Sequence, residues 1–164
     1  MGTGQMFLTL GSMLMFSLLM LRMNTNILAT EDLLMNGKFG VLATTLASSV
    51  MEEASSKAFD QATVDNSVSA LSQITASASL GPDGSETYAS FNDFDDFNGF
   101  HRVDASLPSA VFDIRARVTY AEPTAPNLVA AGKTWHKKIE VTVTSVSMQD
   151  TVRLSTIFSY WTFR

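Results

Sequence analysis

The sequence predicts an α+β protein, in which a long N-terminal α-helix protrudes from a small antiparallel β-sheet head and packs on it with its second half. Three observations predict this fold class. Residues 6–21 are uncharged and mostly large and apolar, the chain has no proline before Pro82, and apolar residues alternate with polar ones in the C-terminal half. We therefore expect a hydrophobic and amphipathic helix in residues 1–60 and an α+β head in residues 61–164.

The apolar segment at residues 6–21 is slightly shorter than the ~20 residues that cross a bilayer core as an upright helix. A secretory signal peptide is the main alternative, since its apolar region is of similar or shorter length. No Lys or Arg precedes the segment, and no pair of small residues with cleavage-site spacing follows it next to Arg22. We therefore expect the segment to remain in the working protein.

An amphipathic pattern continues the helix. Apolar residues recur at steps of three and four from Ile27 to Val50, interleaved with charged residues. Gly37 and Gly40 lie inside this pattern and predict a soft spot or a point of close packing, because glycine costs about 1 kcal/mol relative to alanine in an exposed helix. A helix from about residue 5 to about residue 60 would be roughly 80 Å long, which is more than a small head buries alone.

A polar segment separates this helix from the C-terminal half. Residues 62–79 are rich in Ser, Thr, Ala, Gln and Asn, with a few apolar residues at helical spacing, so we expect a frayed continuation of the helix or a second short one. Residues 81–85 combine two glycines with Pro82 and predict a turn.

The C-terminal half has the period of β-strands. Apolar and polar residues alternate over 112–120, 138–144 and 151–161, which predicts three half-buried strands in a head of three to four. Residues 147–150 form a short hairpin connection between the last two, and residues 121–127 begin a longer loop that ends near Gly132. An antiparallel sheet with one polar face follows, and the second half of the long helix is the expected cover for its apolar face.

Composition excludes several kinds of function. The net charge of the 164 residues is −5, and the eleven Lys and Arg form no run longer than Lys137 and Lys138, so a nucleic acid is not expected as a partner. The chain has no cysteine, which excludes disulfides and thiolate metal sites.

An acidic loop is the strongest candidate for a binding site. Asp93, Asp95, Asp96 and Asn98 place four oxygen-bearing side chains close together before Gly99, as a hard cation such as Ca²⁺ requires. The alternative, which we favour, is a solvated acidic turn whose phenylalanines fill the core between helix and sheet. A further alternative is that two of the aspartates pair with one of three arginines. The acidic residues are Asp95 and Asp96, the phenylalanines are Phe91, Phe94, Phe97 and Phe100, and the arginines are Arg102, Arg115 and Arg117.

Nothing in the sequence indicates an enzyme. There is no nucleophile elbow, no phosphate-binding glycine loop and no histidine pair with metal-ligand spacing. His101 and His136 stand beside basic residues and are expected at the surface, near strand ends. Trp135 and Trp161 would favour a binding function if they were exposed and lay together on the head, although core or interface packing is the simpler expectation for each.

An apolar N-terminal half-helix whose second half packs on an antiparallel sheet resembles the type IV pilin family, including its minor pilins and the pseudopilins of secretion systems. The segment at residues 4–10 is similar to the family's processing site, where a short leader is removed after a glycine. The acidic loop at residues 92–100 is similar to a loop before the sheet of some minor pilins. The fifth position after the predicted cleavage is Thr9, where the family usually carries a glutamate, and no basic residue precedes the site.

The resemblance implies a structural subunit that self-assembles into an extracellular filament of identical copies, displayed at the cell surface after a stage in the inner membrane. No cofactor is expected beyond the Ca²⁺ considered above. The alternative is a single-pass membrane-anchored binding module or a secretion-system assembly factor. Cleavage is expected between Gly4 and Gln5. The residues expected to carry assembly are Phe7, Leu8, Thr9, Leu10, Leu14, Phe16, Leu18 and Leu21.

Overall fold

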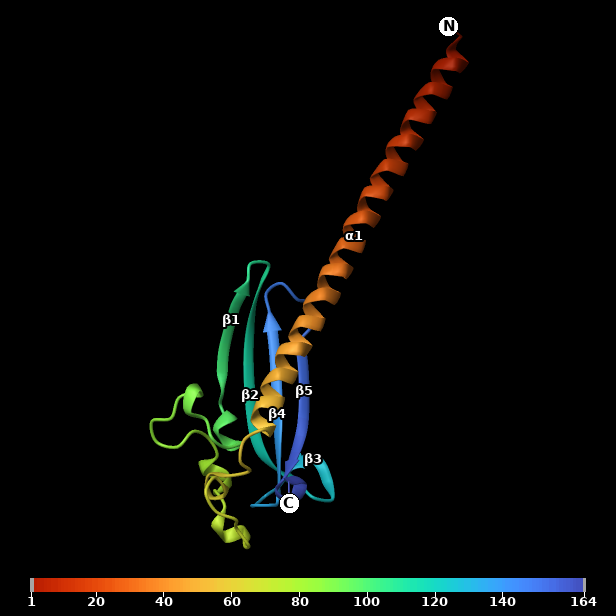
Figure 1. Ribbon diagram of the computed structural model, residues 1–164. Coiled ribbons are helices and arrows are strands. Elements are labelled where there is room, and N and C mark those ends of the chain that lie inside the picture. Colours follow the sequence, from red (N-terminus) through yellow and green to blue (C-terminus); the bar gives the residue numbers. More distant parts are fainter. Residues whose placement is uncertain (1, 164) are drawn as a thin grey trace. The chain divides into compact units, whose positions relative to one another are not determined.

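The computed structural model describes residues 2–163, with one α-helix followed by short 3₁₀ turns and five β-strands (Figure 1). Helix α1 is continuous over Thr3–Ser55, which confirms the long N-terminal helix. The chain divides into two compact units, residues 1–38 and residues 39–164, so the helix belongs to both. The α+β class expected from the sequence is confirmed by the second unit.

The first unit consists of helix alone. Among its described residues only Asn36 is partly buried, and every other side chain is exposed. This part of α1 contains a window of mean hydropathy 1.7 with no buried residue, long and apolar enough to cross a membrane, a test that a signal sequence near the N-terminus also passes. Among residues 2–163, a side chain added at Gly37 or Gly40 would meet no atom within 4 Å. They flank the boundary between the two units.

In the second unit, the remainder of α1 covers the sheet with a stripe of small residues. The stripe recurs at steps of three and four, as a helix face facing a sheet requires. Ala43, Ala47 and Ala54 are fully buried in it, and Phe39 packs edge-on against Phe112 with ring centroids 6.4 Å apart. The expected role of the second half of the helix is therefore confirmed.

The sheet is antiparallel, in the order β1-β2-β4-β5, and β3 pairs with the end of β2. The strands are β1 (His101–Leu107), β2 (Ala110–Glu122), β3 (Ala125–Val129), β4 (His136–Ser145) and β5 (Val152–Ser159). Along β2 and β4 the buried and less buried residues alternate strictly, because successive side chains point to opposite faces. The three strands with a clear period of two are confirmed as β2, β4 and β5.

Two strands were not predicted. In β1 exposed residues alternate with partly buried ones, so its sequence lacks a strong apolar period. β3 occupies part of the predicted loop and is a short edge strand that contains Pro126, whose missing N–H is tolerated at an edge.

The prediction of helix in residues 62–79 was wrong. Over these residues the structure has only 3₁₀ turns, at Gln61–Thr63, Leu71–Gln73 and Ser77–Ser79. Tertiary hydrogen bonds replace those of a helix: Tyr160 Oη accepts from the backbone N–H of Val68 at 2.9 Å and also bonds its carbonyl. The segment is thereby held in an irregular path, while the turn expected at residues 81–85 is present.

The small residues of α1 predict a sharp dependence of stability on side-chain size. Ala47→Leu should lower the free energy of unfolding by about 1–3 kcal/mol, because no space separates this face from the sheet. Ser49→Leu on the exposed face is the matched control and should change it by less than about 0.5 kcal/mol. Urea unfolding of the full chain in mild detergent, followed by tryptophan fluorescence, reports on the head alone because both tryptophans lie there. Equal effects of the two substitutions would contradict the tight packing.

Candidate functional site

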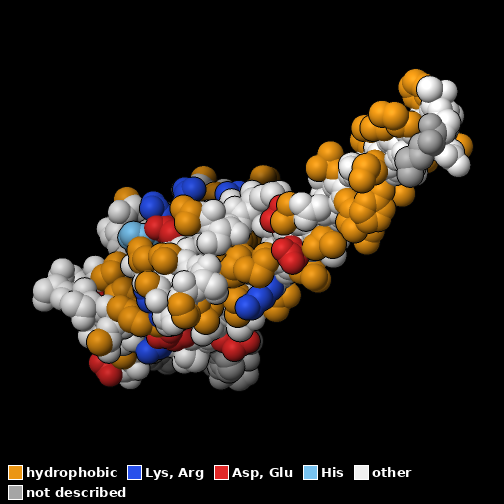
Figure 2. Space-filling model, turned by 90° about the horizontal axis from the view of Figure 1, so that it is seen from above, with side chains coloured by type: hydrophobic (Ala, Val, Ile, Leu, Met, Phe, Trp, Pro, Cys, Tyr) orange, Lys and Arg blue, Asp and Glu red, His pale blue; other side chains and the backbone are white. Residues whose placement is uncertain are grey.

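The first candidate site is the exposed apolar surface of α1. The residues expected to carry assembly all lie on this helix and are exposed; Phe7 and Leu8 are 75% and 76% accessible, and Leu14 is 66% accessible. Hydrophobic side chains cover much of the visible face of this segment (Figure 2). Gly4 and Gln5 lie in the first turns of the helix and are also exposed. The structure leaves the expected cleavage untested.

Two hydroxyl groups near the start of α1 form hydrogen bonds within the helix. Thr9 Oγ1 donates to the carbonyl of Met6, and Ser12 Oγ donates to the carbonyl of Thr9, each at 2.9 Å. Such bonds remove the cost of placing a hydroxyl in an apolar environment. Residues 2–21 therefore present no charged side chain and no unsatisfied hydroxyl at Thr9 or Ser12.

The exposed apolar surface continues well beyond Arg22. Ile27, Leu28, Leu33 and Leu34 are 54–73% accessible, although Glu31 and Asp32 lie among them. A contiguous apolar surface of this extent is rare on soluble monomers and indicates contact with lipid or protein.

The second candidate site is a buried charge cluster inside the head, centred on Lys137 of β4. The Nζ atom of Lys137 lies 2.5 Å from Oδ1 of Asp95 and 2.8 Å from Oδ2 of Asp60, and it donates to the carbonyl of Phe59 at 2.8 Å. Lys137 and the two carboxylates are almost completely inaccessible. The ammonium also lies over the rings of Phe59 and Tyr120, 4.7 and 5.6 Å from their centroids.

Three segments bring this cluster together. The chain leaves α1 and pairs with the acidic loop at Ala58 and Asp93, where Phe94 N–H donates to the Ala58 carbonyl at 2.9 Å. This pairing places Asp60 beside Asp95, while the inward face of β4 supplies Lys137. Asp60 is fixed further by bonds from the backbone N–H groups of Ala62 and Thr75.

The remaining carboxylates of the loop bind backbone. Oδ1 of Asp93 accepts from the N–H groups of Asp95 and Asp96, and Oδ2 of Asp96 accepts from those of Asn92 and Asp93. These local bonds form a closed turn that holds both carboxylates below the surface. The loop phenylalanines are buried beside it, as expected for the core-filling alternative.

The pKa values of the carboxyls in this cluster shift in opposite directions. Burial raises the pKa of Asp93 to about 8, and the neighbouring Asp95 adds to the rise. Burial also raises the pKa of Asp95, although Lys137 opposes it. For Asp60, burial is outweighed by the charge and hydrogen bond of Lys137 and by backbone donors, so its pKa is lowered. The surroundings therefore favour the charged form of Asp60 and the protonated form of Asp93.

The geometry gives the predicted calcium ligands other roles. Within residues 2–163, no group of three or more His, Asp or Glu side chains is placed to hold a metal. Asn98 clamps the sheet, because its Oδ1 accepts from Val118 N–H at 3.0 Å and its Nδ2 donates to the Leu80 carbonyl. The carboxylates are neither solvated nor paired with the arginines considered above; Asp95 pairs with Lys137 instead. That partner was missed because it lies 42 residues away in sequence.

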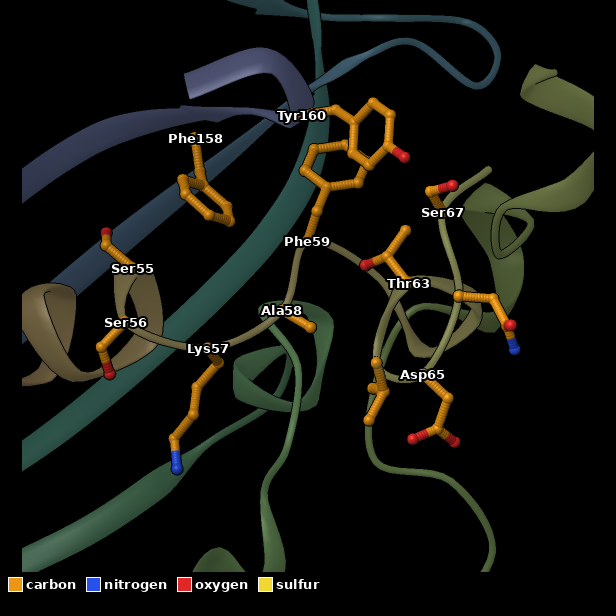
Figure 3. Close-up of a pocket in the computed structure, with 12 residues that line it drawn as sticks. Ser55, Ser56, Lys57, Ala58, Phe59, Thr63, Asp65, Ser67, Phe158 and Tyr160 are labelled. Atoms are coloured by element: carbon orange, nitrogen blue, oxygen red, sulfur yellow. The ribbon is translucent and has the colours of Figure 1, made fainter. Parts of the chain in front are cut away.

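A groove of about 580 Å³ lies between the end of α1, residues 63–67 and the end of β5 (Figure 3). Its lining includes Lys57 and Asp65 as charged residues, and it contains no histidine. The rings of Phe59 and Tyr160, which both line the groove, pack against each other with centroids 5.6 Å apart.

The histidines lie where the sequence places them, at strand ends. His101 begins β1 and bonds Asp113 at 2.7 Å, and His136 begins β4 and bonds Ser159. The tryptophans lie together: Trp135 is 5.7 Å from Trp161 between ring centroids, and Trp161 is 51% accessible. Trp135 is half-buried and packs against the core, so of the two tryptophans Trp161 alone is exposed.

Comparisons with protein families, with curated proteins and with solved structures find no match for this chain.

The charge cluster predicts a large cost for losing its cation. Lys137→Met should lower the free energy of unfolding by about 3–5 kcal/mol, because it leaves the buried Asp60 and Asp95 without their shared partner. Lys138→Met, at the next position but on the opposite face of β4, should cost less than about 0.5 kcal/mol. Denaturant titration of both variants in detergent measures the difference, and a similar small effect for both would contradict the role of the cluster.

The pKa of Asp93 predicts a pH dependence of stability. The folded state keeps this proton up to a pKa of about 8, whereas the unfolded state releases it near the ordinary aspartate pKa of 3.8. The free energy of unfolding should therefore fall as pH rises through this window, by about 1.4 kcal/mol per pH unit from this group. Asp93→Asn keeps the acceptor oxygen but cannot ionise, so it should flatten the slope, whereas the exposed control Asp150→Asn should not. Parallel slopes for all three proteins would disprove the assignment.

Proposed function

We propose that the chain is a structural subunit of an extracellular filament of the type IV pilus kind, which self-assembles through the first part of α1. Before assembly the same helix anchors the chain in a membrane. The head is then carried at the surface of the filament. The proposal rests on physical argument from the exposed helix, together with the resemblance in sequence pattern.

The observation that carries the proposal is the length of the exposed apolar surface. A bilayer core accommodates about 20 residues, which residues 2–21 supply. The apolar surface from Ile27 to Met35 begins after Arg22 and is interrupted by Glu31 and Asp32, so it does not belong to the same span of lipid. At a rise of 1.5 Å per residue, the helix is roughly 25 Å long from residue 22 to residue 38. Protein is the surface that covers it best.

A second copy of the helix can provide both apolar packing and contacts between opposite charges. Apolar side chains would pack against each other, with Gly11 and Ser12 allowing close approach, and the opposite charges of Arg22 and Lys38 against Glu31 and Asp32 would offset one another between copies. Methionines at several exposed positions, including Met13 and Met35, are adaptable fillers for an irregular interface.

The second candidate function is a membrane-anchored binding module. It is favoured by the adjacent Trp135 and Trp161, because clustered, partly exposed aromatic rings are common at binding surfaces. This function needs residues 2–21 in lipid but gives no role to the apolar surface beyond Arg22.

A substitution beyond the lipid span distinguishes the two functions. Leu34→Asp should abolish filaments in the fraction sheared from cells while the chain stays in the membrane with a folded head, because Leu34 is 68% accessible and lies outside residues 2–21. Leu14→Asp should abolish filaments as well and also weaken membrane retention. Val146→Asp, at a 98% accessible position of the head, is the control and should leave filaments intact. Immunoblots and electron microscopy of sheared and membrane fractions give the readout.

Two outcomes would contradict the filament. If the unsubstituted chain is absent from the sheared fraction and remains in membranes, the anchored module is favoured. If Leu34→Asp assembles as well as Val146→Asp does, the apolar surface beyond Arg22 is not an assembly contact.

A further inference from the structure

In the head, the buried amine of Lys137 lies close enough to the carboxyl of Asp95 for the two groups to react. Lys137 Nζ and the carboxyl of Asp95 are in direct contact at 2.5 Å, and neither is accessible to solvent. Fully buried lysines are rare, and this one is surrounded by aromatic rings as well as by acids. Four functional groups meet here: the amine, the carboxyls of Asp60 and Asp95 that it touches, and the carboxyl of Asp93 beside Asp95.

We propose that Lys137 and Asp95 join in an intramolecular isopeptide bond, formed between Nζ of the lysine and Cγ of the aspartate with loss of one water molecule. The proposal rests on the geometry of the head and does not depend on the filament function. It assigns a covalent modification to a pair of residues that would otherwise form a salt bridge.

The step balances without any other reactant. The lysine ammonium passes one proton to the carboxylate of Asp60, and Asp93 passes its proton to the carboxyl of Asp95. The neutral amine attacks Cγ of Asp95, and the tetrahedral intermediate returns one nitrogen proton to Asp93. A Cγ–O bond then breaks, and the departing oxygen takes the proton from Asp60 and leaves as water. Ammonium and carboxylate thus become amide and water, with no oxidation and no net change in charge.

The hydrogen bonds distinguish the two carboxyls that touch the amine. Asp60 also accepts from Ala62 N–H and from the N–H and hydroxyl of Thr75, which stabilise it as a carboxylate suited to accept a proton. Asp95 shares a side-chain hydrogen bond with Asp93, whose raised pKa of about 8 keeps a proton available there. A protonated carboxyl is the better electrophile, so the contacts favour attack on Asp95.

The surroundings favour the neutral product. Phe94 and Phe97 are fully buried in the same loop, and the rings of Phe59 and Tyr120 face the ammonium. An apolar enclosure raises the energy of the ion pair relative to the uncharged amide. Holding the two groups in contact also gives a high effective concentration for the reaction, as in other oriented intramolecular reactions.

The bond would tie the acidic loop permanently to β4 in the middle of the sheet. It would close the chain between residues 95 and 137 and fix the loop that covers one end of the core. A head secured in this way resists unfolding under load or protease.

Peptide mapping of the full chain by mass spectrometry tests the proposal. Trypsin does not cleave after an acylated lysine, so residues 58–102 should remain joined to residues 134–138 under denaturing conditions, with a mass one water below the sum of the two peptides. Lys137→Arg and Asp95→Ala should abolish the joined species, and the exposed control Asp113→Asn should retain it. Asp60→Asn should slow its appearance in newly made protein at least tenfold, by removing the proton acceptor.

Two results on the unsubstituted protein would overturn the proposal, whatever the variants do. One is release of the free peptide 134–137, which requires an unmodified Lys137. The other is loss of one water while the two peptides separate, which would place the dehydration elsewhere, for example at the Asp83–Gly84 turn.

Discussion

The head depends on one buried interaction, the contact of the Lys137 ammonium with Asp60 and Asp95. These residues come from the chain after α1, from the acidic loop and from β4, so a single cation holds three segments together. Burying charges is expensive unless each is paired and hydrogen-bonded, and here the backbone N–H groups of Ala62 and Thr75 also donate to the Asp60 carboxylate. The same contact specifies the path of residues 56–100, which contain little regular structure. Whether it is an ion pair or a covalent bond, it determines how the loop meets the sheet.

Helix α1 is one continuous helix with two different surroundings, an exposed first part and a second part that packs on the sheet. From Phe39 its inner face carries alanines and fits closely on the sheet, whereas the large apolar side chains of residues 6–35 are exposed. A protein with such a surface is completed only by lipid or by other protein. The filament proposal supplies both in sequence, first a membrane and then copies of the same helix. The paired tryptophans at the end of the head are the feature that this function does not require.

Much of the fold could be predicted from periodicity. The helix over Thr3–Ser55 and the strands β2, β4 and β5 have strong repeats of 3.6 or 2 residues, which follow from backbone geometry alone. β1 and β3 were missed because edge strands bury little and their patterns are weak. Residues 62–79 have helical spacing, but hydrogen bonds to Tyr160 and Asp60, distant in sequence, stabilise another path.

The sequence by itself determined the class of the fold, the exposed apolar helix and the presence of an acidic loop, because each depends on residues close together in the chain. Only the tertiary structure decided what that loop does. Its aspartates have the composition of a cation site, yet Lys137 approaches from β4 and occupies the place of the cation. Lys137 stands two residues before Ile139, so the alternation of β4 already places it on the inward face. Only the tertiary structure shows that Asp60 and Asp95 meet it there, because both are distant from it in sequence.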